Sequence, residues 1–549
     1  MSRTTPSGLL DHHFARFLAA RSALEKDDRA RFLELVEELS LAMSDGHSCL
    51  PVDRHGRDVL GKSPLVSGSG LTPLILDQDR LYLHRYHRYE SRLAGQLAGL
   101  AVRQYNFPSA RTLLDDCFGP DLAEPDWQKK AAEVALSKAL CIISGGPGTG
   151  KTSTVVKIIG LLLQAAEGDL RIALAAPTGK AAMRMQEAIA NSIGDTPGGL
   201  AFPEAILRKI PTTATTLHRL LGVRRNMPQF RHTGDNPLPW DVLVVDEASM
   251  VDLALMSKMV DALKPEARLI LLGDKDQLTS VESGAVLPDC IRSLPTNTVE
   301  LKKSYRFDRG IKSLATAINA GDGEQAWSLL NGDAHANVGL LRNPYFGSIG
   351  GKYAAYMEVV DNVARLGMRE VFRAFGGFQV LCAARHGARG VQGINAVVEN
   401  HLKRMGYDCF SDPWYAGRPI LITANDYSLE LFNGDIGICL PDPADGSMKV
   451  WFERGDGTLK SCLPYRIPRC ETVYAMTIHK SQGSEFREVV VILPEEESRL
   501  LSRQLVYTAV TRAKESVQIV ASKKILVYAL QSDYPRHSGL SQMLAKQGI

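Results

Sequence analysis

Residues 141–160 read CIISGGPGTGKTSTVVKIIG, and this segment sets the fold class of the chain. An apolar strand-like run leads into the pattern GxxxxGK[ST], and an apolar helical run follows, as in a phosphate-binding loop. The glycines allow backbone N–H groups to approach phosphate oxygens, which a Cβ atom would obstruct. The residues expected to contact a nucleotide are therefore Gly145, Gly146, Pro147, Gly148, Thr149, Gly150, Lys151 and Thr152.

The chemistry expected of this loop is the binding of ATP together with Mg²⁺. Lys151 can neutralise the β- and γ-phosphates, and the Thr152 hydroxyl can bind the metal. The N-terminus of the helix that begins here adds a favourable dipole. A glycine-rich turn without a ligand is the alternative, and the complete pattern between a strand and a helix disfavours it.

Polar residues after two further strand-like runs complete the expected hydrolytic site. In VLVVDEAS (242–249), Asp246 is expected to hold Mg²⁺ and Glu247 to act on the attacking water. In LLGDKDQL (271–278), Gln277 is a candidate sensor of the γ-phosphate. Two arginines, Arg306 and Arg512, are expected to reach the developing charge from a second domain.

The alternation of apolar runs with helical segments predicts two α/β domains with parallel sheets. The first is expected over residues 121–300 and the second over 301–549. Within the second, residues from about 414 to 473 form short strand-like runs with turn signals, which indicates a small inserted β-barrel. Residues 1–120 are expected to form a mostly helical domain, and no constellation in them indicates chemistry.

Composition excludes several classes of protein. The 549 residues contain 64 basic and 61 acidic side chains, so a net charge of +3 does not by itself indicate a nucleic-acid partner. No apolar run reaches the ~18 residues that cross a bilayer, and we expect no membrane association. Nine cysteines without CxxC pairs predict reduced thiols in a cytoplasmic protein, with neither a disulfide framework nor a zinc site.

Four further blocks carry a resemblance to a known family. They are LAAPTGKAA (174–182), TTLHRLLG (215–222), TIHKSQGSEF (477–486) and VYTAVTRAK (506–514). In their order and spacing, the chain resembles the RecD family, the alpha subunits of bacterial exodeoxyribonuclease V (RecBCD), within the superfamily-1 DNA helicases. The resemblance implies two RecA-like P-loop NTPase domains, an SH3-like β-barrel insertion and an N-terminal domain that docks on a partner subunit.

The resemblance also implies roles for individual residues. Gln128 would contact the adenine. Gln277, Arg306 and Arg512 would sense the γ-phosphate, and the two arginines would act as arginine fingers. Backbone amides and hydroxyls in the remaining blocks can follow phosphates without reading bases. The residues implied to bind single-stranded DNA are Pro177, Thr178, Gly179, Lys180, Thr216, His218, Thr477 and His479.

The function implied is that of an ATP-dependent 5′–3′ DNA helicase subunit in double-strand break repair and homologous recombination. Its partners would be single-stranded and duplex-end DNA and the RecB and RecC subunits. No acidic constellation beyond the ATP site suggests a two-metal nuclease, so nucleolysis would belong to the assembly. Two alternatives remain open: a free-standing superfamily-1 DNA or RNA helicase, and a nucleotide-gated regulatory subunit with little motor activity.

Overall fold

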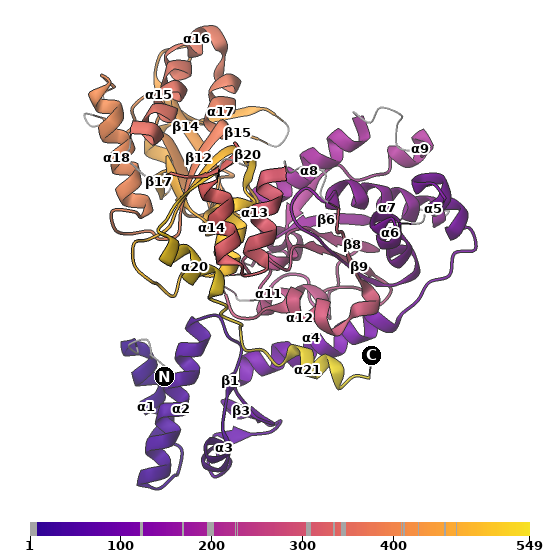
Figure 1. Ribbon diagram of the computed structural model, residues 1–549. Coiled ribbons are helices and arrows are strands. Elements are labelled where there is room, and N and C mark those ends of the chain that lie inside the picture. Colours follow the sequence, from indigo (N-terminus) through magenta and orange to yellow (C-terminus); the bar gives the residue numbers. More distant parts are fainter. Residues whose placement is uncertain are drawn as a thin grey trace.

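The computed structural model (Figure 1) contains two large α/β lobes and a smaller N-terminal lobe. It describes residues 8–120, 124–166, 170–194, 202–224, 227, 229–280, 282–303, 309–332, 335–341, 347–407, 409, 412–426, 428–454, 457–467 and 469–548. Among these residues, none of the helices combines the length and the apolar composition that crossing a bilayer requires.

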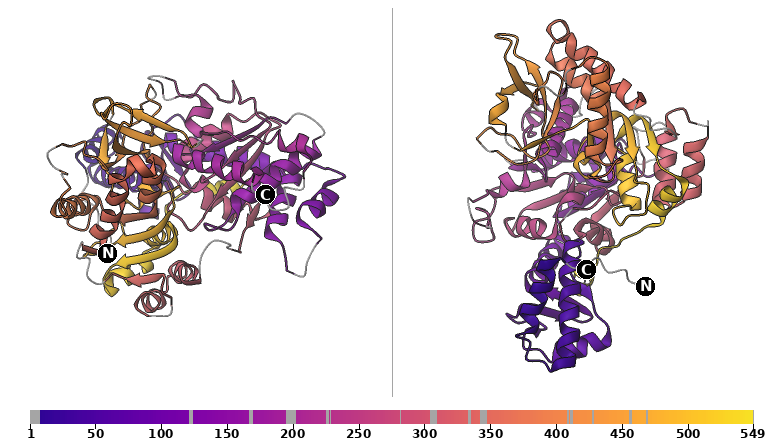
Figure 2. Two further views of the ribbon diagram at one scale, coloured as in Figure 1. Left: turned by 90° about the horizontal axis from the view of Figure 1, so that it is seen from above. Right: turned by 90° about the vertical axis from the view of Figure 1, so that its left-hand side faces the viewer.

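The N-terminal lobe combines helices with a small four-stranded sheet of order β1-β4-β3-β2. Figures 1 and 2 show this lobe projecting from one end of the molecule. Its own core is built around Phe32, Leu35 and Leu39, which recur on one face of α2. Its elements are α1 (Leu9–Ala19), α2 (Lys26–Ser44), β1 (Leu50–Pro51), α3 (Arg54–Gly61), β2 (Val66–Ser67), β3 (Leu74–Asp77), β4 (Arg80–Leu83) and α4 (His84–Val102).

The first α/β lobe contains a six-stranded sheet of order β10-β5-β9-β8-β6-β7, in which every pairing is parallel. Alternate residues of β5 enter two cores, with Cys141 and Ile143 on one face and Leu140 and Ile142 on the other. The strands are β5 (Leu140–Ser144), β6 (Ile172–Ala176), β7 (Ala214–Thr216), β8 (Val242–Val245), β9 (Arg268–Gly273) and β10 (Thr298–Glu300).

Helices cover both faces of this sheet, as a parallel sheet requires. One core includes residues of α5 (Ala110–Phe118), α6 (Trp127–Ser137), α7 (Lys151–Ala165) and α8 (Gly179–Gly194). The other includes residues of α4, α10 (Leu217–Leu221), α11 (Leu253–Asp261) and α12 (Val286–Ser293). The shorter elements of the lobe are α9 (Glu204–Leu207), η1 (Ala248–Met250) and η2 (Pro295–Asn297).

The second α/β lobe contains a five-stranded sheet of order β11-β20-β19-β12-β18, again parallel throughout. The prediction of two parallel α/β sheets is therefore confirmed. The strands are β11 (Val338–Leu340), β12 (Phe378–Cys382), β18 (Ala475–Thr477), β19 (Phe486–Ile492) and β20 (Ala513–Val520). The helices are α13 (Arg309–Asn319), α14 (Gly323–Asn331), α15 (Gly347–Asp361), α16 (Val363–Leu366), α17 (Met368–Gly377), α18 (Val391–Arg404), η4 (His479–Ser481), α19 (Arg503–Val510) and α20 (Lys523–Gln531).

Between β12 and β18 the chain forms a separate antiparallel sheet of order β16-β15-β14-β13-β17. Its small core contains Ile420, Ile422 and Val450. Its elements are β13 (Pro419–Ile422), β14 (Ile436–Pro441), β15 (Met448–Glu453), β16 (Leu459–Cys462), η3 (Pro464–Arg466) and β17 (Cys470–Thr472).

The C-terminal segment leaves the second lobe after α20 and packs on the first. Helix α21 (Leu540–Ala545) contacts α4 and α12, and Leu540 and Leu544 are buried there. The fully buried Glu90 of α4 accepts hydrogen bonds from the Ser538 hydroxyl at 2.8 Å and from the Gly539 N–H at 3.0 Å. The two large lobes are thus joined by this C-terminal segment as well as by the chain that follows β10.

Candidate functional site: a nucleotide cavity between two lobes

The glycine-rich loop follows β5 and leads into α7, as the sequence predicts. Gly148 and Gly150 adopt φ values of +77° and +83°, in the left-handed region that favours glycine. A Cβ atom on Gly145 would lie 2.7 Å from Thr149 Oγ1, and one on Gly146 would lie 3.0 Å from the Tyr507 hydroxyl. The loop therefore has the tight, side-chain-free backbone that a phosphate cradle needs.

Two polar side chains lie against this loop. The Lys151 ammonium donates to the carbonyl oxygens of Gly145 at 2.6 Å and Gly146 at 3.1 Å. Gln128, on α6, donates from Nε2 to the Thr149 carbonyl at 3.4 Å. Lys151 thus holds its charge inside the loop, and Gln128 lies at the loop's edge.

Asp246 and Glu247 follow β8, next to the loop. The pKa of Asp246 is raised to about 6, mainly by burial and also by the neighbouring Glu247 charge, while the Lys151 charge opposes the shift. Glu247 has a φ of +51°, an uncommon conformation for a residue with a side chain, and its N–H donates to Asp246 Oδ1 at 2.8 Å. Such backbone strain is typical of functional sites.

Gln277 and Arg512 meet across the boundary between the two lobes. Arg512 is 2% exposed, and its Nη2 donates to Gln277 Oε1 at 2.8 Å. Gln277 Nε2 donates to Asp274 Oδ2 at 2.9 Å, and the Tyr507 hydroxyl of α19 donates to the same oxygen at 3.2 Å. Burial lowers the pKa of Arg512 and raises that of Asp274. The loop after β9 is therefore bonded to residues from both ends of the 507–512 segment.

These residues enclose one cavity of about 280 Å³. Five expected residues of the hydrolytic site line it together, namely Lys151, Thr152, Asp246, Glu247 and Gln277, with Arg512 contributed by the second lobe. The loop geometry, the lysine and the paired carboxylates fit a nucleotide phosphate chain. The raised pKa of Asp246 fits a cation beside it, because a positive charge would favour the ionised carboxylate. Arg306, the other expected arginine, lies outside the described residues.

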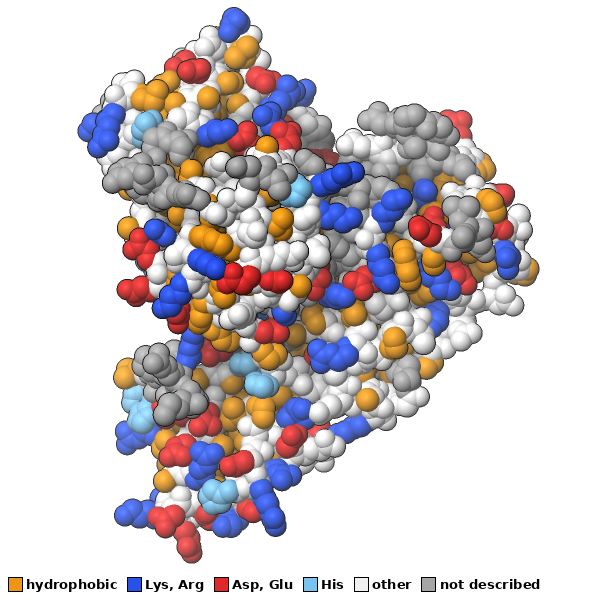
Figure 3. Space-filling model, in the orientation of Figure 1, with side chains coloured by type: hydrophobic (Ala, Val, Ile, Leu, Met, Phe, Trp, Pro, Cys, Tyr) orange, Lys and Arg blue, Asp and Glu red, His pale blue; other side chains and the backbone are white. Residues whose placement is uncertain are grey.

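The residues expected to contact DNA lie at the carboxyl ends of three strands. Ala176, at the end of β6, pairs in register with Thr216 at the end of β7, so the loop with Pro177 begins beside Thr216. Thr477 ends β18 in the second lobe. Figure 3 shows several Lys and Arg side chains around the hollow between the two lobes.

Several of these side chains also have local structural bonds. Thr178 Oγ1 accepts from the Ala181 N–H at 3.2 Å, Thr216 Oγ1 from Arg219 N–H at 3.2 Å, and Thr477 Oγ1 from Lys480 N–H at 3.3 Å. Gly179 faces Phe432 in the loop between β13 and β14, because a Cβ atom on Gly179 would lie 3.8 Å from the Phe432 Cβ.

The pKa values of three basic residues of this set are shifted. The pKa of Lys180 is lowered to about 8, mainly by burial and also by the Arg184 charge, while Asp435 opposes the shift. Burial also lowers the pKa values of His218 and His479. Both shifts favour the neutral imidazole, which can act as a hydrogen-bond donor and acceptor.

Sequence reasoning missed several residues that the structure brings to the cavity. Arg184 and Glu485 line it from opposite lobes, and their side chains are 2.7 Å apart. Asp274 accepts from Gln277 Nε2 and from the Tyr507 hydroxyl, so Tyr507 supports the carboxylate that positions Gln277. Glu485 and Tyr507 stand inside the quoted blocks 477–486 and 506–514, but only the pairing of the lobes shows what these side chains contact.

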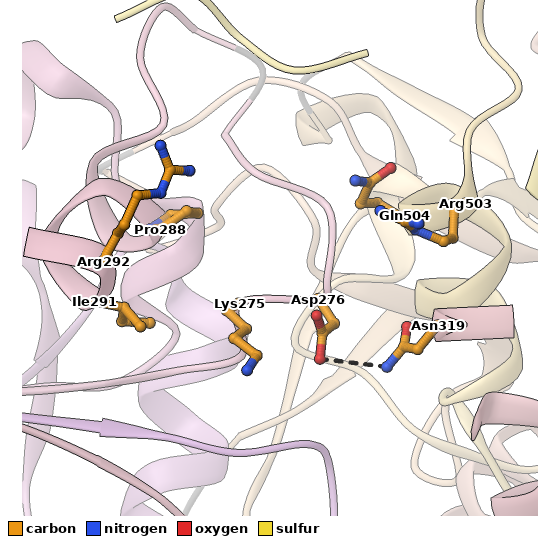
Figure 4. A pocket seen from close by; sticks show the side chains of 8 residues that line it. All are labelled: Lys275, Asp276, Pro288, Ile291, Arg292, Asn319, Arg503 and Gln504. Carbon is orange, nitrogen blue, oxygen red and sulfur yellow. Dashed lines mark hydrogen bonds between the residues drawn. The ribbon is translucent and has the colours of Figure 1, made fainter. Parts of the chain in front are cut away.

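A second cavity of about 280 Å³ also lies between the lobes (Figure 4). Asp276 Oδ2 accepts from Asn319 Nδ2 across it at 3.3 Å. Its basic side chains have acidic partners: Lys275 with Glu300, Arg503 with Asp533 and Arg292 with Asp289. The basic side chains of this second cavity are therefore paired with acidic groups. Among the described residues there is no group of three or more His, Cys, Asp or Glu side chains suited to a metal ion.

Comparison with known proteins agrees with this geometry. Residues 128–283 match the AAA domain family model, and residues 472–520 match the UvrD-like helicase C-terminal domain. The RecBCD enzyme subunit RecD of Mycolicibacterium smegmatis is 40% identical over 500 residues, covering 89% of this chain and 86% of that protein. The chain belongs to the RecD family.

Other members and relatives of the RecD family are more distant. The RecBCD enzyme subunit RecD of Haemophilus influenzae is 34% identical, covering 86% of this chain and 81% of that protein. The ATP-dependent RecD2 DNA helicase of Deinococcus radiodurans is 31% identical, covering 90% of this chain and 66% of that protein. Among solved structures, Bacteroides Pif1 bound to single-stranded DNA is 16% identical with a TM-score of 0.41, covering 74% of this chain and 94% of that chain.

Proposed function

We propose that this chain is an ATP-dependent DNA helicase subunit that unwinds duplex DNA ends with 5′–3′ polarity. The observation that carries this proposal is the Arg512–Gln277 contact beside Glu247, because it makes the hydrolytic site complete only when the two lobes are together. An arginine supplied across a cleft is typically worth ~10³–10⁵ in rate, so hydrolysis would depend on lobe closure.

Each residue of the expected ATP site has a proposed role. Lys151 and the loop amides bind the phosphates, Gln128 contacts the adenine, and Glu247 holds and deprotonates the attacking water. Gln277, Arg512 and Arg306 stabilise charge on the transferred group. Thr152 and Asp246 would hold Mg²⁺, which when bound neutralises phosphate charge.

The loops at the strand ends would bind single-stranded DNA across both lobes. Because these loops offer backbone amides and hydroxyls, they suit a strand of any sequence. Separating a duplex costs on average ~1.4 kcal/mol per base-pair step, which requires an energy source coupled to movement. Lobe closure on ATP and opening after hydrolysis would supply this coupling, because each lobe holds part of the DNA-contacting set.

The domain roles follow the same proposal. Residues 121–300 and 301–549 would be the two RecA-like domains, and the inserted antiparallel sheet would be an SH3-like barrel. Residues 1–120 would dock on a partner subunit. The names of the relatives place them in the RecBCD enzyme, so RecB and RecC are the proposed partners, in double-strand break repair and recombination.

The direct test is ATP hydrolysis by the full-length chain with and without single-stranded DNA. Stimulation by DNA that is lost in Lys151→Gln supports the proposal, and hydrolysis indifferent to DNA contradicts it. Two other functions predict different outcomes. A free-standing helicase, favoured by the 31% identity to a protein named as a DNA helicase, would unwind without RecB and RecC. A regulatory subunit would retain part of its function in Lys151→Gln.

A further inference from the structure

Arg184 lies where the nucleotide cavity meets the second lobe. It stands on α8, four residues after Lys180, so the two side chains share one face of the helix. Arg184 lines the cavity with Lys151, Asp246 and Glu247. One helix therefore carries a proposed DNA-contacting residue in its first turn and a cavity residue in its second.

The Arg184 guanidinium bonds to the second lobe at two points. Nη1 donates to the Gly483 carbonyl at 2.9 Å, and Nη2 lies 2.7 Å from Glu485 Oε1. The Gly483 turn, with a φ of +68°, packs directly on α8, since a Cβ atom there would lie 3.4 Å from that of Ala181. This two-point contact needs the planar fork of arginine, which lysine does not have.

Arg512 holds the residue between these two points. Its Nη1 donates to the Ser484 carbonyl at 3.2 Å, while its Nη2 reaches Gln277. Arg184 thus bonds Gly483 and Glu485, and Arg512 bonds Ser484 between them. The segment 483–485 is consequently held between two arginines that both line the nucleotide cavity.

The Arg184–Glu485 pair is enclosed on the Glu485 side, whereas the Arg184 side chain is 32% exposed. The Glu485 side chain is 9% exposed, and Lys514 Nζ lies 3.6 Å from its other oxygen. Breaking an enclosed pair leaves a carboxylate without its main partner, which is strongly unfavourable. The contact is therefore expected to form or break as a unit when the lobes move.

The same segment directly follows the residues expected to hold DNA. Thr477 and His479 stand a few residues before Gly483, and Gln482 Nε2 donates to the Leu278 carbonyl at 2.9 Å, next to Gln277. If residues 477–482 move when DNA binds, the movement would therefore displace both the segment that Arg184 contacts and the loop that carries Gln277.

We propose that Arg184 is a positioning residue that couples DNA binding at the 477–482 block to ATP hydrolysis, by holding residues 483–485 where Arg512 reaches Gln277. This inference rests on the proposed function. It predicts that loss of Arg184 lowers the ratio of DNA-stimulated to basal ATP turnover, beyond any effect on basal turnover itself.

The test compares Arg184→Gln, Arg184→Lys, Glu485→Gln and the double variant Arg184→Gln/Glu485→Gln in the full-length chain. Basal and DNA-stimulated kcat, KM for ATP and the melting temperature are measured for each. We expect the stimulation ratio to fall at least about tenfold in Arg184→Gln and Glu485→Gln. Arg184→Lys should lower the ratio nearly as much as Arg184→Gln, because lysine cannot make the bidentate contact. The double variant should be no worse than either single variant, as for two residues acting through one contact.

Arg208→Gln is the matched control, because Arg208 pairs with Glu204 at 2.6 Å on an exposed helix away from the cavity. It should leave the ratio unchanged. Equal falls in basal and stimulated turnover would overturn the coupling, since they indicate a direct catalytic role. Additive losses in the double variant would overturn it too. An unmodified chain without DNA stimulation contradicts the proposed function as well, whereas stimulation that survives Arg184→Gln contradicts the coupling alone.

Discussion

Arg512, carried by the second lobe, donates to Gln277 of the first lobe at 2.8 Å while remaining 2% exposed. Arg512 lines the cavity together with Lys151, Asp246 and Glu247. Because Arg512 comes from the other lobe, it can occupy this place only when the two lobes are in contact. The position of the Arg512 guanidinium is therefore fixed by burial and by its hydrogen bonds, unlike that of a flexible surface arginine.

Replacing Arg512 tests this relationship. Arg512→Lys keeps a positive charge but loses the hydrogen bonds to Ser484 and Gln277, so we expect ATP turnover to fall by about 10³-fold. The affinity for a fluorescent ATP analogue should change much less, because the phosphate loop is intact. A turnover within threefold of the unmodified chain would show that Arg512 only supports the fold, and circular dichroism confirms folding of the variant.

Replacing Gly150 tests whether the glycine-rich loop binds the nucleotide phosphates. Gly150→Ala places a Cβ atom 2.6 Å from Gln128 Nε2 at a φ of +83°, so we expect the nucleotide affinity to fall at least about tenfold. Gly367→Ala is the matched control, because Gly367 has a φ of +85° and no neighbour within 4 Å of the new Cβ atom. Isothermal titration with ATP should separate the two, and equal affinities would contradict the assigned cradle.

Lys180 predicts a pH dependence of DNA binding. Its pKa is lowered to about 8, so the free chain loses this charge as the pH rises through 8. Phosphate groups favour the charged form, and binding should take up a proton and weaken between pH 7 and 9, by less than about tenfold per pH unit. Fluorescence anisotropy with a single-stranded oligonucleotide measures this. Lys180→Gln should bind more weakly, lack this pH response and lower the salt slope by about 1.

Glu90 predicts a pH dependence of stability. Burial raises its pKa above the ordinary glutamate value, so its contribution to stability is present below that ordinary value and is lost as the pH rises through the raised pKa. Glu90→Gln can still accept from the Gly539 N–H and can donate to the Ser48 and Ser538 hydroxyls once these rotate. The melting temperature of the variant minus that of the unmodified chain should therefore increase from pH 5 to pH 8. A constant difference would contradict a shifted Glu90.

The grouping of Lys151, Asp246 and Gln277 around one cavity could be predicted because parallel strands end at one edge of a sheet. Lys151 follows β5, Asp246 follows β8 and Gln277 follows β9, so their convergence depends on local patterns and on a regular topology. The two parallel sheets were predictable for the same reason, since fully buried strands read as continuous apolar runs.

The contacts between lobes were not predictable from local patterns. Arg184 pairs with Glu485 some three hundred residues away, and the return of α21 to α4 buries residues separated by more than four hundred positions. Neither produces a periodicity or a spacing signal. The left-handed backbone of Glu247 was equally hidden, because no glycine or turn motif stands at this position in the sequence.

The most direct test of the central claim is ATP-dependent strand displacement on matched duplexes with a 5′ or a 3′ single-stranded tail. The full-length chain is measured alone and with RecB and RecC, each time against Lys151→Gln. Displacement from the 5′ tail only, abolished in Lys151→Gln, is the predicted result. Displacement from the 3′ tail by the chain itself, or displacement that survives Lys151→Gln, would contradict the account.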